Sequence, residues 1–248
     1  MSILLILAFL FAVGSLIGWG IEVLFRHSVT KKWLNPGFLI GPYLPIYGFS
    51  LCVLYLLTMI EPYLSMDNIV LRKALLFLMM AVVITGIEYT AGLIFIKGMK
   101  IKLWDYSNEC GNIQGIICPK FSFFWLVLSA VYYFLVHPHI LDMLQWLASN
   151  LAFSFCIGFF FGVFVLDLAY SFRIVYRIRR FAAEHQIVVR LEELKADIQN
   201  SKKNRGEGHR FLFSLRSGQP LKEHLEQYLN GTEVQKRLQE LRSRMRRK

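Results

Sequence analysis

The stretch ILLILAFLFAVGSLIGWGIEVLF, from Ile3 to Phe25, decides the class of this fold. Its one charged residue is Glu22, and it exceeds the roughly 20 helical residues that cross the hydrocarbon layer of a bilayer. No basic region precedes the stretch and no small-x-small cleavage site follows it. We therefore expect a retained transmembrane helix rather than a signal peptide.

Four further apolar stretches resemble the first in composition. Hydrophobic residues make up 55% of the 248-residue chain and the mean hydropathy is +0.45, which excludes a soluble enzyme. We predict an all-α fold, a polytopic membrane helix bundle of about five transmembrane helices. The other spans are expected at residues 43–60, 74–96, 121–136 and 151–172, and the span at 121–136 is short.

Charge divides the chain into two parts. Of the 28 Lys and Arg residues, 19 lie from Arg173 onward, where 9 of the 17 Asp and Glu residues also lie. Residues 1–172 therefore hold 9 basic and 8 acidic side chains and are almost neutral, whereas residues 173–248 are strongly basic. We expect a transmembrane domain over 1–172 and a basic, helical cytoplasmic tail over 173–248.

The basic residues of the short connections predict the orientation of the spans. The connections after the first and third spans are rich in Lys and Arg, the one after the second holds only Arg72 and Lys73, and the one after the fourth holds none. Because basic connections stay in the cytoplasm, we expect the N-terminus outside and the tail inside. The basic residues after the first and third spans are Arg26, Lys31, Lys32, Lys97, Lys100, Lys102 and Lys120.

Three carboxylates fall within predicted spans: Glu22, Glu88 and Asp167. Intramembrane charge is costly, so each is a candidate for a functional site. Their positions along the helices place all three in the cytoplasmic half, where they could share one polar site. Thr85 and Tyr89 are the nearby hydrogen-bond partners for Glu88.

Local neutralisation is the alternative for two of these acids. Arg26 follows Glu22 by four residues, the spacing of an ion pair on one helix face. Ser171 or Arg173 could hold Asp167 in the same way.

Small residues precede two of the acids by about one helical turn. Gly14 and Gly18 form one small-xxx-small pair, and Gly158 and Gly162 form a second. Such pairs let helix backbones approach closely. We therefore expect both pairs to lie at helix contacts.

Residues 35–48, NPGFLIGPYLPIYG, combine Pro and Gly with apolar side chains, which is unusual for a solvated loop. Broken backbone at membrane depth is tolerated only where protein buries it or a watery cavity adjoins it. We expect a re-entrant or interfacial segment. The alternative is a tight loop that leads into a helix with Pro45 in its first turn. Asn35 and Tyr47 are the candidate binding residues of this segment.

The connection after the third span holds the run Trp104, Asp105, Tyr106 and Ser107, followed by Asn112. Trp and Tyr favour the headgroup level of a membrane, so an interfacial anchor explains them. An anchor does not explain an Asp between the two rings with Ser and Asn close behind. These polar side chains could ligate a cation or hydrogen-bond a lipid headgroup.

Several short motifs occur in a characteristic order and spacing. They are GWGIE at 18–22, GFLIGPYLPIYG at 37–48, Glu88-Tyr89 with Gly92, WDYS at 104–107, CPKFSFFW at 118–125, and Asp167 with Ser171. Together they resemble the putative ABC-transporter type IV permease family of bacterial membrane proteins. The resemblance covers nearly the whole membrane domain and leaves out the tail. It implies a transport protein of the bacterial cytoplasmic membrane and names no substrate.

Two stretches of the tail show helical periodicity. Each is shorter than two heptads, so we expect packing of the two helices on each other or on a partner rather than a coiled coil. The apolar positions are Ile187, Leu191, Leu194 and Ile198 in the first stretch, and Val234, Leu238, Leu241 and Met245 in the second.

Residues 242–248 hold a cluster of basic side chains at the C-terminus. They could bind anionic lipid. A solvated tail that enforces the topology is the alternative. Nucleic acid is not an expected partner, because no suitable fold or aromatic stacking pattern accompanies the cluster.

These features predict an integral membrane protein, a permease-like transporter subunit that binds a small solute or ion near the cytoplasmic side. The chain has no Gly-x-x-x-x-Gly-Lys-Ser/Thr phosphate loop, so ATP hydrolysis would need a separate ATPase chain. We expect no cofactor. A bound metal and the oligomeric state stay open.

Two other functions are compatible with the sequence. The first is a membrane-embedded enzyme for a lipid or lipid-linked substrate, with the carboxylates and Asp105 as acid/base groups or metal ligands. The predicted spans contain no His and no recognisable nucleophile–base spacing, which weighs against it. The second is a noncatalytic assembly or regulatory protein whose tail recruits partners.

Overall fold

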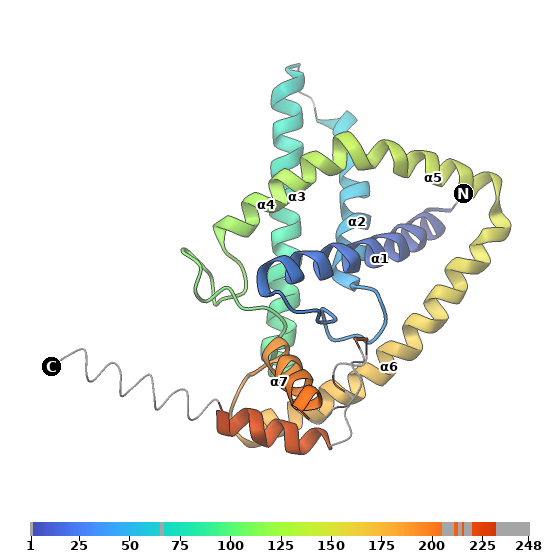
Figure 1. Cartoon of the computed structure of the whole chain (residues 1–248). Coiled ribbons are helices and arrows are strands. Elements are labelled where there is room, and N and C mark those ends of the chain that lie inside the picture. The colour runs from blue at the N-terminus through green and yellow to red at the C-terminus, as the bar shows by residue number, and fades with distance from the viewer. Residues whose placement is uncertain (1, 65–66, 205–210, 213–214, 216–219, 232–248) are drawn as a thin grey trace.

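The computed structural model describes residues 2–64, 67–204, 211–212, 215 and 220–231 (Figure 1). The second periodic stretch of the tail and its terminal basic cluster lie outside these residues, so both stay predictions. The positions concerned are Val234, Leu238, Leu241 and Met245, and residues 242–248.

Within the described residues, five helical segments are long and apolar enough to cross a membrane, which confirms the predicted all-α membrane bundle. In chain order they are α1 (Ile3–Thr30); α2 (Pro45–Thr58) with the 3₁₀ turn η1 (Glu61–Tyr63); α3 (Ile69–Leu93) with the π turn η2 (Ile94–Gly98); α4 (Pro119–Val131) with the π turn η3 (Tyr132–Val136) and α5 (His137–Ser149); and the 3₁₀ turn η4 (Leu151–Phe153) with α6 (Ser154–Glu184).

Local signals in the sequence set the starts of three helices. Asn68 precedes α3, and its Oδ1 accepts hydrogen bonds from the amides of Val70 at 2.9 Å and Leu71 at 3.2 Å. Pro45 and Pro119 begin α2 and α4, where the missing N–H would have had no helical partner. The start of α2 matches the alternative in which a loop leads into a helix at Pro45.

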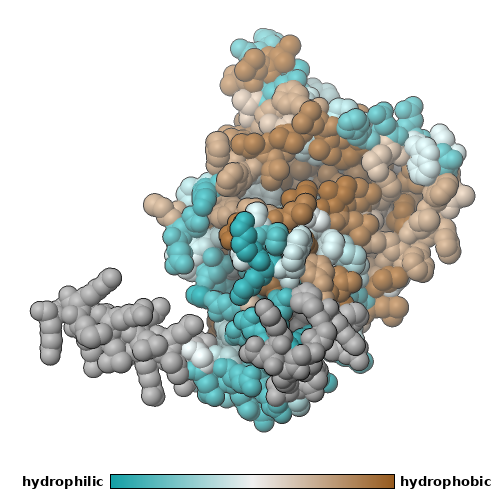
Figure 2. Space-filling view, viewed as in Figure 1, coloured by the Kyte–Doolittle hydropathy of each residue, from teal (hydrophilic) through white to brown (hydrophobic). Residues whose placement is uncertain are grey.

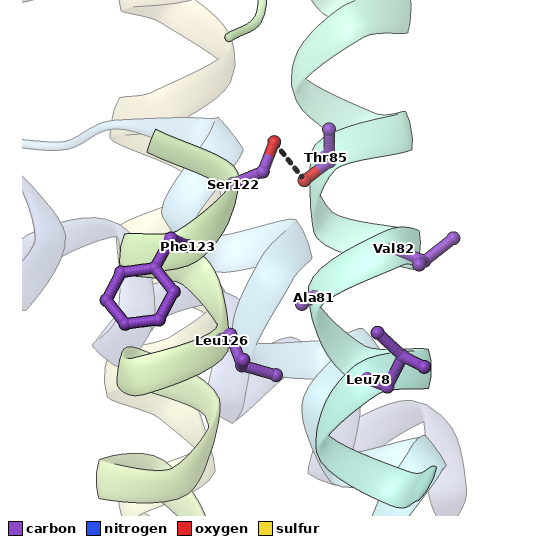
Figure 3. A pocket seen from close by; sticks show the side chains of 7 residues that line it. All are labelled: Leu78, Ala81, Val82, Thr85, Ser122, Phe123 and Leu126. Atoms are coloured by element: carbon purple, nitrogen blue, oxygen red, sulfur yellow. Dashed lines mark hydrogen bonds between the residues drawn. The ribbon is translucent and has the colours of Figure 1, made fainter. Parts of the chain in front are cut away.

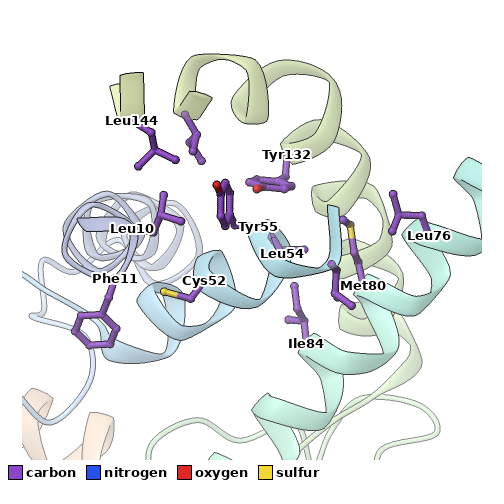
Figure 4. Close-up of a cluster of buried hydrophobic side chains, with 12 residues drawn as sticks. Leu10, Phe11, Cys52, Leu54, Tyr55, Leu76, Met80, Ile84, Tyr132 and Leu144 are labelled. Carbon is purple, nitrogen blue, oxygen red and sulfur yellow. The ribbon is translucent and has the colours of Figure 1, made fainter. Parts of the chain in front are cut away.

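The fourth span continues beyond its predicted end. α4 and η3 reach Val136, and α5 follows them and lies across the end of α2 (Figure 1). Ile140 and Leu144 of α5 are buried in a core cluster with Leu10 of α1 and Tyr55 of α2 (Figure 4). The amphipathic helix α5 thus covers one end of the bundle.

Small residues allow α1 and α2 to pack at close range. A Cβ atom on Gly18 would lie 2.2 Å from Cβ of Tyr47, and one on Gly14 would also meet α2. The prediction for this pair is confirmed. The prediction for Gly158 and Gly162 is wrong, because a Cβ atom on either meets no described atom within 4 Å. Apart from Ile157, the residues of α6 from Ser154 to Tyr170 are exposed or half-buried.

The tail begins as a continuation of the last span. α6 runs through residue 172 without a break, and a short strand β2 (Val189–Arg190) follows it. β2 pairs in parallel with β1 (Ile101–Lys102) of the connection after α3. We call the end of the bundle at which this pairing occurs the tail end. The division at residue 172 between membrane domain and tail stays a prediction.

A second hydrophobic core lies at the tail end. It joins α6 and β1 to α7 (Leu191–Asn204) and to a helix over residues 221–231. Leu191, Leu194 and Ile198 of α7 are all buried in it, which confirms the helix for these three positions of the first periodic stretch. The prediction is wrong for Ile187, which precedes β2 and lies outside the helix, although it packs against the same core.

The surface reflects the two parts of the chain. In Figure 2, hydrophobic residues cover most of the face formed by the spans, and hydrophilic residues gather at the tail end. Large apolar side chains such as Leu78, Val82, Phe155, Phe159 and Leu166 are exposed. A surface of this kind suits contact with lipid chains.

Replacing Gly18 by Ala should destabilise the bundle, because the new methyl group would overlap the Tyr47 side chain. Overpacking of this kind costs about 1–3 kcal/mol. Gly20→Ala is the matched control, since a Cβ atom there meets no described atom within 4 Å. Thermal unfolding of both variants in one detergent, followed by circular dichroism, measures the difference. Equal melting temperatures would contradict close α1–α2 packing at Gly18.

Candidate functional site

Glu88 of α3 is a buried carboxylate with neutral partners. Its Oε1 accepts a hydrogen bond from the Tyr106 hydroxyl at 3.1 Å, and its Oε2 accepts one from Nε1 of Trp125 at 2.9 Å. No described Lys or Arg forms an ion pair with it. The sequence suggested Thr85 as a partner, but Thr85 instead donates to Ser122 at 3.3 Å. Glu88 therefore has hydrogen-bond donors but no countercharge.

Glu22 of α1 lies near Glu88 but is neutralised locally. Arg26 Nε donates to its Oε1 at 2.7 Å, which confirms the predicted ion pair. The Tyr47 hydroxyl donates to its Oε2 at 2.8 Å, and the Tyr47 ring lies 6.3 Å from the Trp125 ring. The two carboxylates thus lie on either side of an aromatic pair. We call the following residues the Glu22–Glu88 cluster: Glu22, Tyr47, Glu88, Tyr106 and Trp125.

Asp167 of α6 lies outside this cluster and holds the loop over residues 31–44. It accepts hydrogen bonds from the amides of Ile40, at 3.1 Å, and Gly41, at 2.7 Å. The hydroxyls of Tyr43 and Ser171 donate to it at 2.7 and 2.8 Å. Neutral donors from the loop and from its own helix therefore surround this carboxylate. Of the three acids expected to share a site, two lie together and Asp167 has a separate place.

Asn35 satisfies the irregular backbone of the same loop. Its side chain is buried, and Nδ2 donates to the carbonyls of Leu39 at 3.1 Å and Ile40 at 2.9 Å. Its Oδ1 accepts from Nε1 of Trp19 on α1 at 2.7 Å. Because buried backbone groups need partners, Asn35 and Asp167 together allow the loop to pack under the bundle without regular structure.

Asp105 joins the connection after α3 to the tail. Its Oδ1 accepts from Lys102 at 2.6 Å and from the Ser107 hydroxyl at 2.5 Å, and its Oδ2 pairs with Arg190 of β2 at 2.9 Å. Burial by itself raises the pKa of Asp105, but the hydrogen bonds from Lys102 and Ser107 outweigh burial and hold the pKa below its usual value. Asp105 is therefore an ionised acid between two basic side chains.

The remaining polar residues of this connection stabilise its own turns. Nε1 of Trp104 donates to the Ile116 carbonyl at 2.9 Å. Asn112 donates to the Ser107 carbonyl at 3.2 Å and accepts from the amide of Gly115 at 2.9 Å. These bonds shape the connection so that Tyr106 can reach Glu88.

The acids do not form a metal site in the described part of the chain. No group of three or more His, Cys, Asp or Glu side chains comes together there. Asp105 lies with Lys102 and Arg190 rather than with the acids of the spans. Among the described residues, Asp105 therefore does not join the acids of the spans in one ligand set.

A groove of about 270 Å³ opens between α3 and α4. Its walls are mostly apolar, with Leu78, Phe123 and Leu126 among the lining residues. The hydrogen-bonded pair Thr85 and Ser122 forms its polar part (Figure 3). This pair precedes Glu88 and Trp125 by about one turn on the respective helices. None of the five residues of the Glu22–Glu88 cluster lines this groove.

Sequence reasoning missed both tryptophans that donate at the site, Trp19 and Trp125. A Trp in or beside a span is usually an interfacial anchor, so its N–H donor gave no distinct signal. It also missed a polar group at the far end of the bundle. There the Tyr133 hydroxyl donates to Glu61 at 2.5 Å, and the Tyr132 hydroxyl lies 3.0 Å from Nδ1 of His137.

Comparison with known proteins agrees with the motifs of the membrane domain. A family model described as putative ABC-transporter type IV matches residues 9–172. The matched range begins in α1, ends in α6 and includes every member of the Glu22–Glu88 cluster. No curated protein and no solved structure matches the chain.

Replacing Asp167 by Asn should loosen the loop, because the new amide group cannot accept all four hydrogen bonds. Each buried donor left without an acceptor costs about 1–3 kcal/mol. Hydrogen exchange of residues 38–43 should therefore become faster. Asp142→Asn is the control, because Asp142 is exposed on α5. Unchanged exchange in the Asp167 variant would show that the loop does not depend on this acid.

Proposed function

The chain belongs to the putative ABC-transporter type IV family and is a membrane transporter-like protein, and on this premise we propose that it binds a small solute or ion at the Glu22–Glu88 cluster. We place this cluster near the cytoplasmic side of the membrane. The two acids and the three aromatic donors around them come from four parts of the chain: α1, α2, α3 with the connection after it, and α4.

The state of Glu88 is the observation that carries this proposal. It is only 4% exposed and receives two hydrogen bonds from neutral donors. A charged carboxylate in a membrane span without a basic partner is costly, so such residues commonly bind ions or protons. Glu22 differs, since Arg26 already neutralises it. Glu88 is therefore the acid that a cation, a proton or the cationic part of a solute would neutralise.

The basic connections support the proposed orientation. Lys31 and Lys32 follow α1, and Lys97 and Lys100 follow the third span, all at the tail end. The α6 segment just beyond the membrane also carries several arginines. By the positive-inside rule, the tail end faces the cytoplasm and the N-terminus faces outward.

The energy source would lie in another chain. No phosphate-binding Gly-x-x-x-x-Gly-Lys-Ser/Thr loop occurs in the sequence. The family assignment points to an ATPase as the partner. The tail and the two connections at the tail end offer this ATPase a polar surface for binding.

Glu88→Gln should weaken ligand binding at the cluster, because the amide keeps the size of the side chain and removes its charge. Purified protein in mild detergent is titrated with sodium, potassium and ethylammonium while tryptophan emission is recorded, since Trp125 donates to Glu88. Native mass spectrometry of each variant identifies whatever stays bound. We expect a saturable response in the unmodified chain and a loss of at least about tenfold in affinity in the variant, the value of one charge-assisted contact.

Glu109→Gln is the matched control. Glu109 lies in the connection after α3 and pairs with the exposed Lys120 at 3.0 Å, away from Glu88. It should bind like the unmodified chain. Equal binding by the Glu88 and Glu109 variants would contradict the proposal.

Capture of the full chain from its native membranes should co-purify an ATPase chain, identified by mass spectrometry and by ATP hydrolysis of the complex. If no ATPase co-purifies, and a lipid stays bound to the unmodified chain but not to Glu88→Gln, the result would instead favour the membrane-embedded enzyme. Capture of unrelated partners that do not depend on Glu88 would favour the assembly or regulatory role.

A further inference from the structure

A lysine of the tail is buried against the loop at the tail end. Lys195 of α7 is 3% exposed, and its Nζ donates to the carbonyl of Asn35 at 2.9 Å and to the carbonyl of Gly37 at 2.5 Å. No described carboxylate forms an ion pair with it. A buried lysine is rarely held in this way, since burial of a charge normally requires an opposite charge.

The two carbonyls match the donors of an amine. They belong to residues 160 and 158 positions earlier in the chain, in the part of the loop that Asn35 shapes. A primary amine has two N–H donors when neutral and three when protonated, so it can satisfy both carbonyls in either form. Arg or a tertiary amine could not do so with the same geometry.

We propose that the carbonyls of Asn35 and Gly37 form a receptor for a primary amine, and that Lys195, bound in it, keeps α7 docked on the tail end of the bundle. This docking closes the bundle beneath the Glu22–Glu88 cluster, a consequence that rests on the proposed function. The receptor itself does not depend on that function.

Other contacts of the tail surround the same place. Arg26, which neutralises Glu22, also pairs with Glu192 of α7. Nδ2 of Asn35 donates to the carbonyl of Leu212 at 3.3 Å, and the Phe211 ring lies 6.0 Å from the Trp19 ring. The tail therefore touches both the loop and α1, the helix that carries Glu22. Lys195 and Asn35 are both buried at this interface.

The electrostatic surroundings of Lys195 agree with an amine that can lose a proton. Burial, and then the positive charge of Arg26, lower its pKa to about 7 from the usual 10.5. The charged groups around it are Arg26 from α1 and, paired with Arg26, Glu22 from α1 and Glu192 from α7. Between these two pKa values the docked tail binds fewer protons than the released tail. Docking should therefore strengthen as the pH rises from about 7 toward 9.

Lys195→Ala tests the receptor in the full-length protein. The variant should undock α7, so that amides of residues 35–44 and 191–202 exchange roughly tenfold faster, the change expected for loss of a buried hydrogen-bonded group. Propylamine has the atoms that the substitution removes. Added propylamine should restore slow exchange, whereas N,N-dimethylpropylamine, which lacks the pair of N–H donors, should not.

Lys222→Met is the control for loss of a tail lysine, because the Lys222 side chain is 80% exposed. Hydrogen exchange of Lys222→Met should match that of the unmodified chain. If Lys195→Ala does not survive purification, Lys195→Met takes its place. Its amides should also exchange fast, but propylamine should not rescue it. Slow exchange in a folded Lys195 variant, or equal rescue by both amines, would overturn the proposal.

A pH series adds an independent readout. After correction for intrinsic exchange, protection of residues 35–44 should rise between about pH 7 and 9 in the unmodified chain and stay flat in Lys195→Met. Equal pH dependence in both would also overturn the proposal. Failure of the receptor would appear in the hydrogen exchange of residues 35–44 and 191–202, whereas failure of the proposed binding site would appear in the ligand titration of Glu88→Gln, so the two failures are read from different measurements.

Discussion

The need to satisfy every buried backbone group shapes the tail end of this molecule. The loop over residues 31–44 has no regular structure, yet it packs against α1, α6 and α7. Asp167 accepts hydrogen bonds from two of its amides. Asn35 donates to two of its carbonyls, and Lys195 donates to two others. Each buried backbone N–H or C=O group without a hydrogen-bond partner would cost several kcal/mol. Three polar side chains from distant parts of the chain therefore make the loop possible, and the loop in turn positions the tail.

The three carboxylates of the spans differ in their hydrogen-bonding and charged partners, and therefore in role. Asp167 is surrounded by donors that the loop needs, so its charge has a structural purpose. Glu22 shares Arg26 with Glu192 and so links the bundle to α7. Glu88 receives only a phenol and an indole. The partners, rather than the acids themselves, make Glu88 the candidate for binding a cation or proton.

The tail packs into the tail end of the bundle. β1 and β2 pair residues from the connection after α3 with residues beyond α6, and a second hydrophobic core forms around that pair. Asp105 then bridges Lys102 and Arg190 across the same junction. The tail is thereby joined to the connection whose Tyr106 donates to Glu88.

Local sequence was enough for the five spans, the Glu22–Arg26 pair and the buried positions of α7, because hydropathy and helical spacing act over a few residues. It could not show that Gly158 and Gly162 face no neighbouring helix, since small residues look alike whether or not a partner is present. Tertiary structure alone decided that Trp125, 37 positions from Glu88, donates to it, and that Lys195 reaches a loop 160 positions earlier. Such partners are chosen by how the helices pack, and that packing depends on contacts along the whole chain rather than on any local pattern.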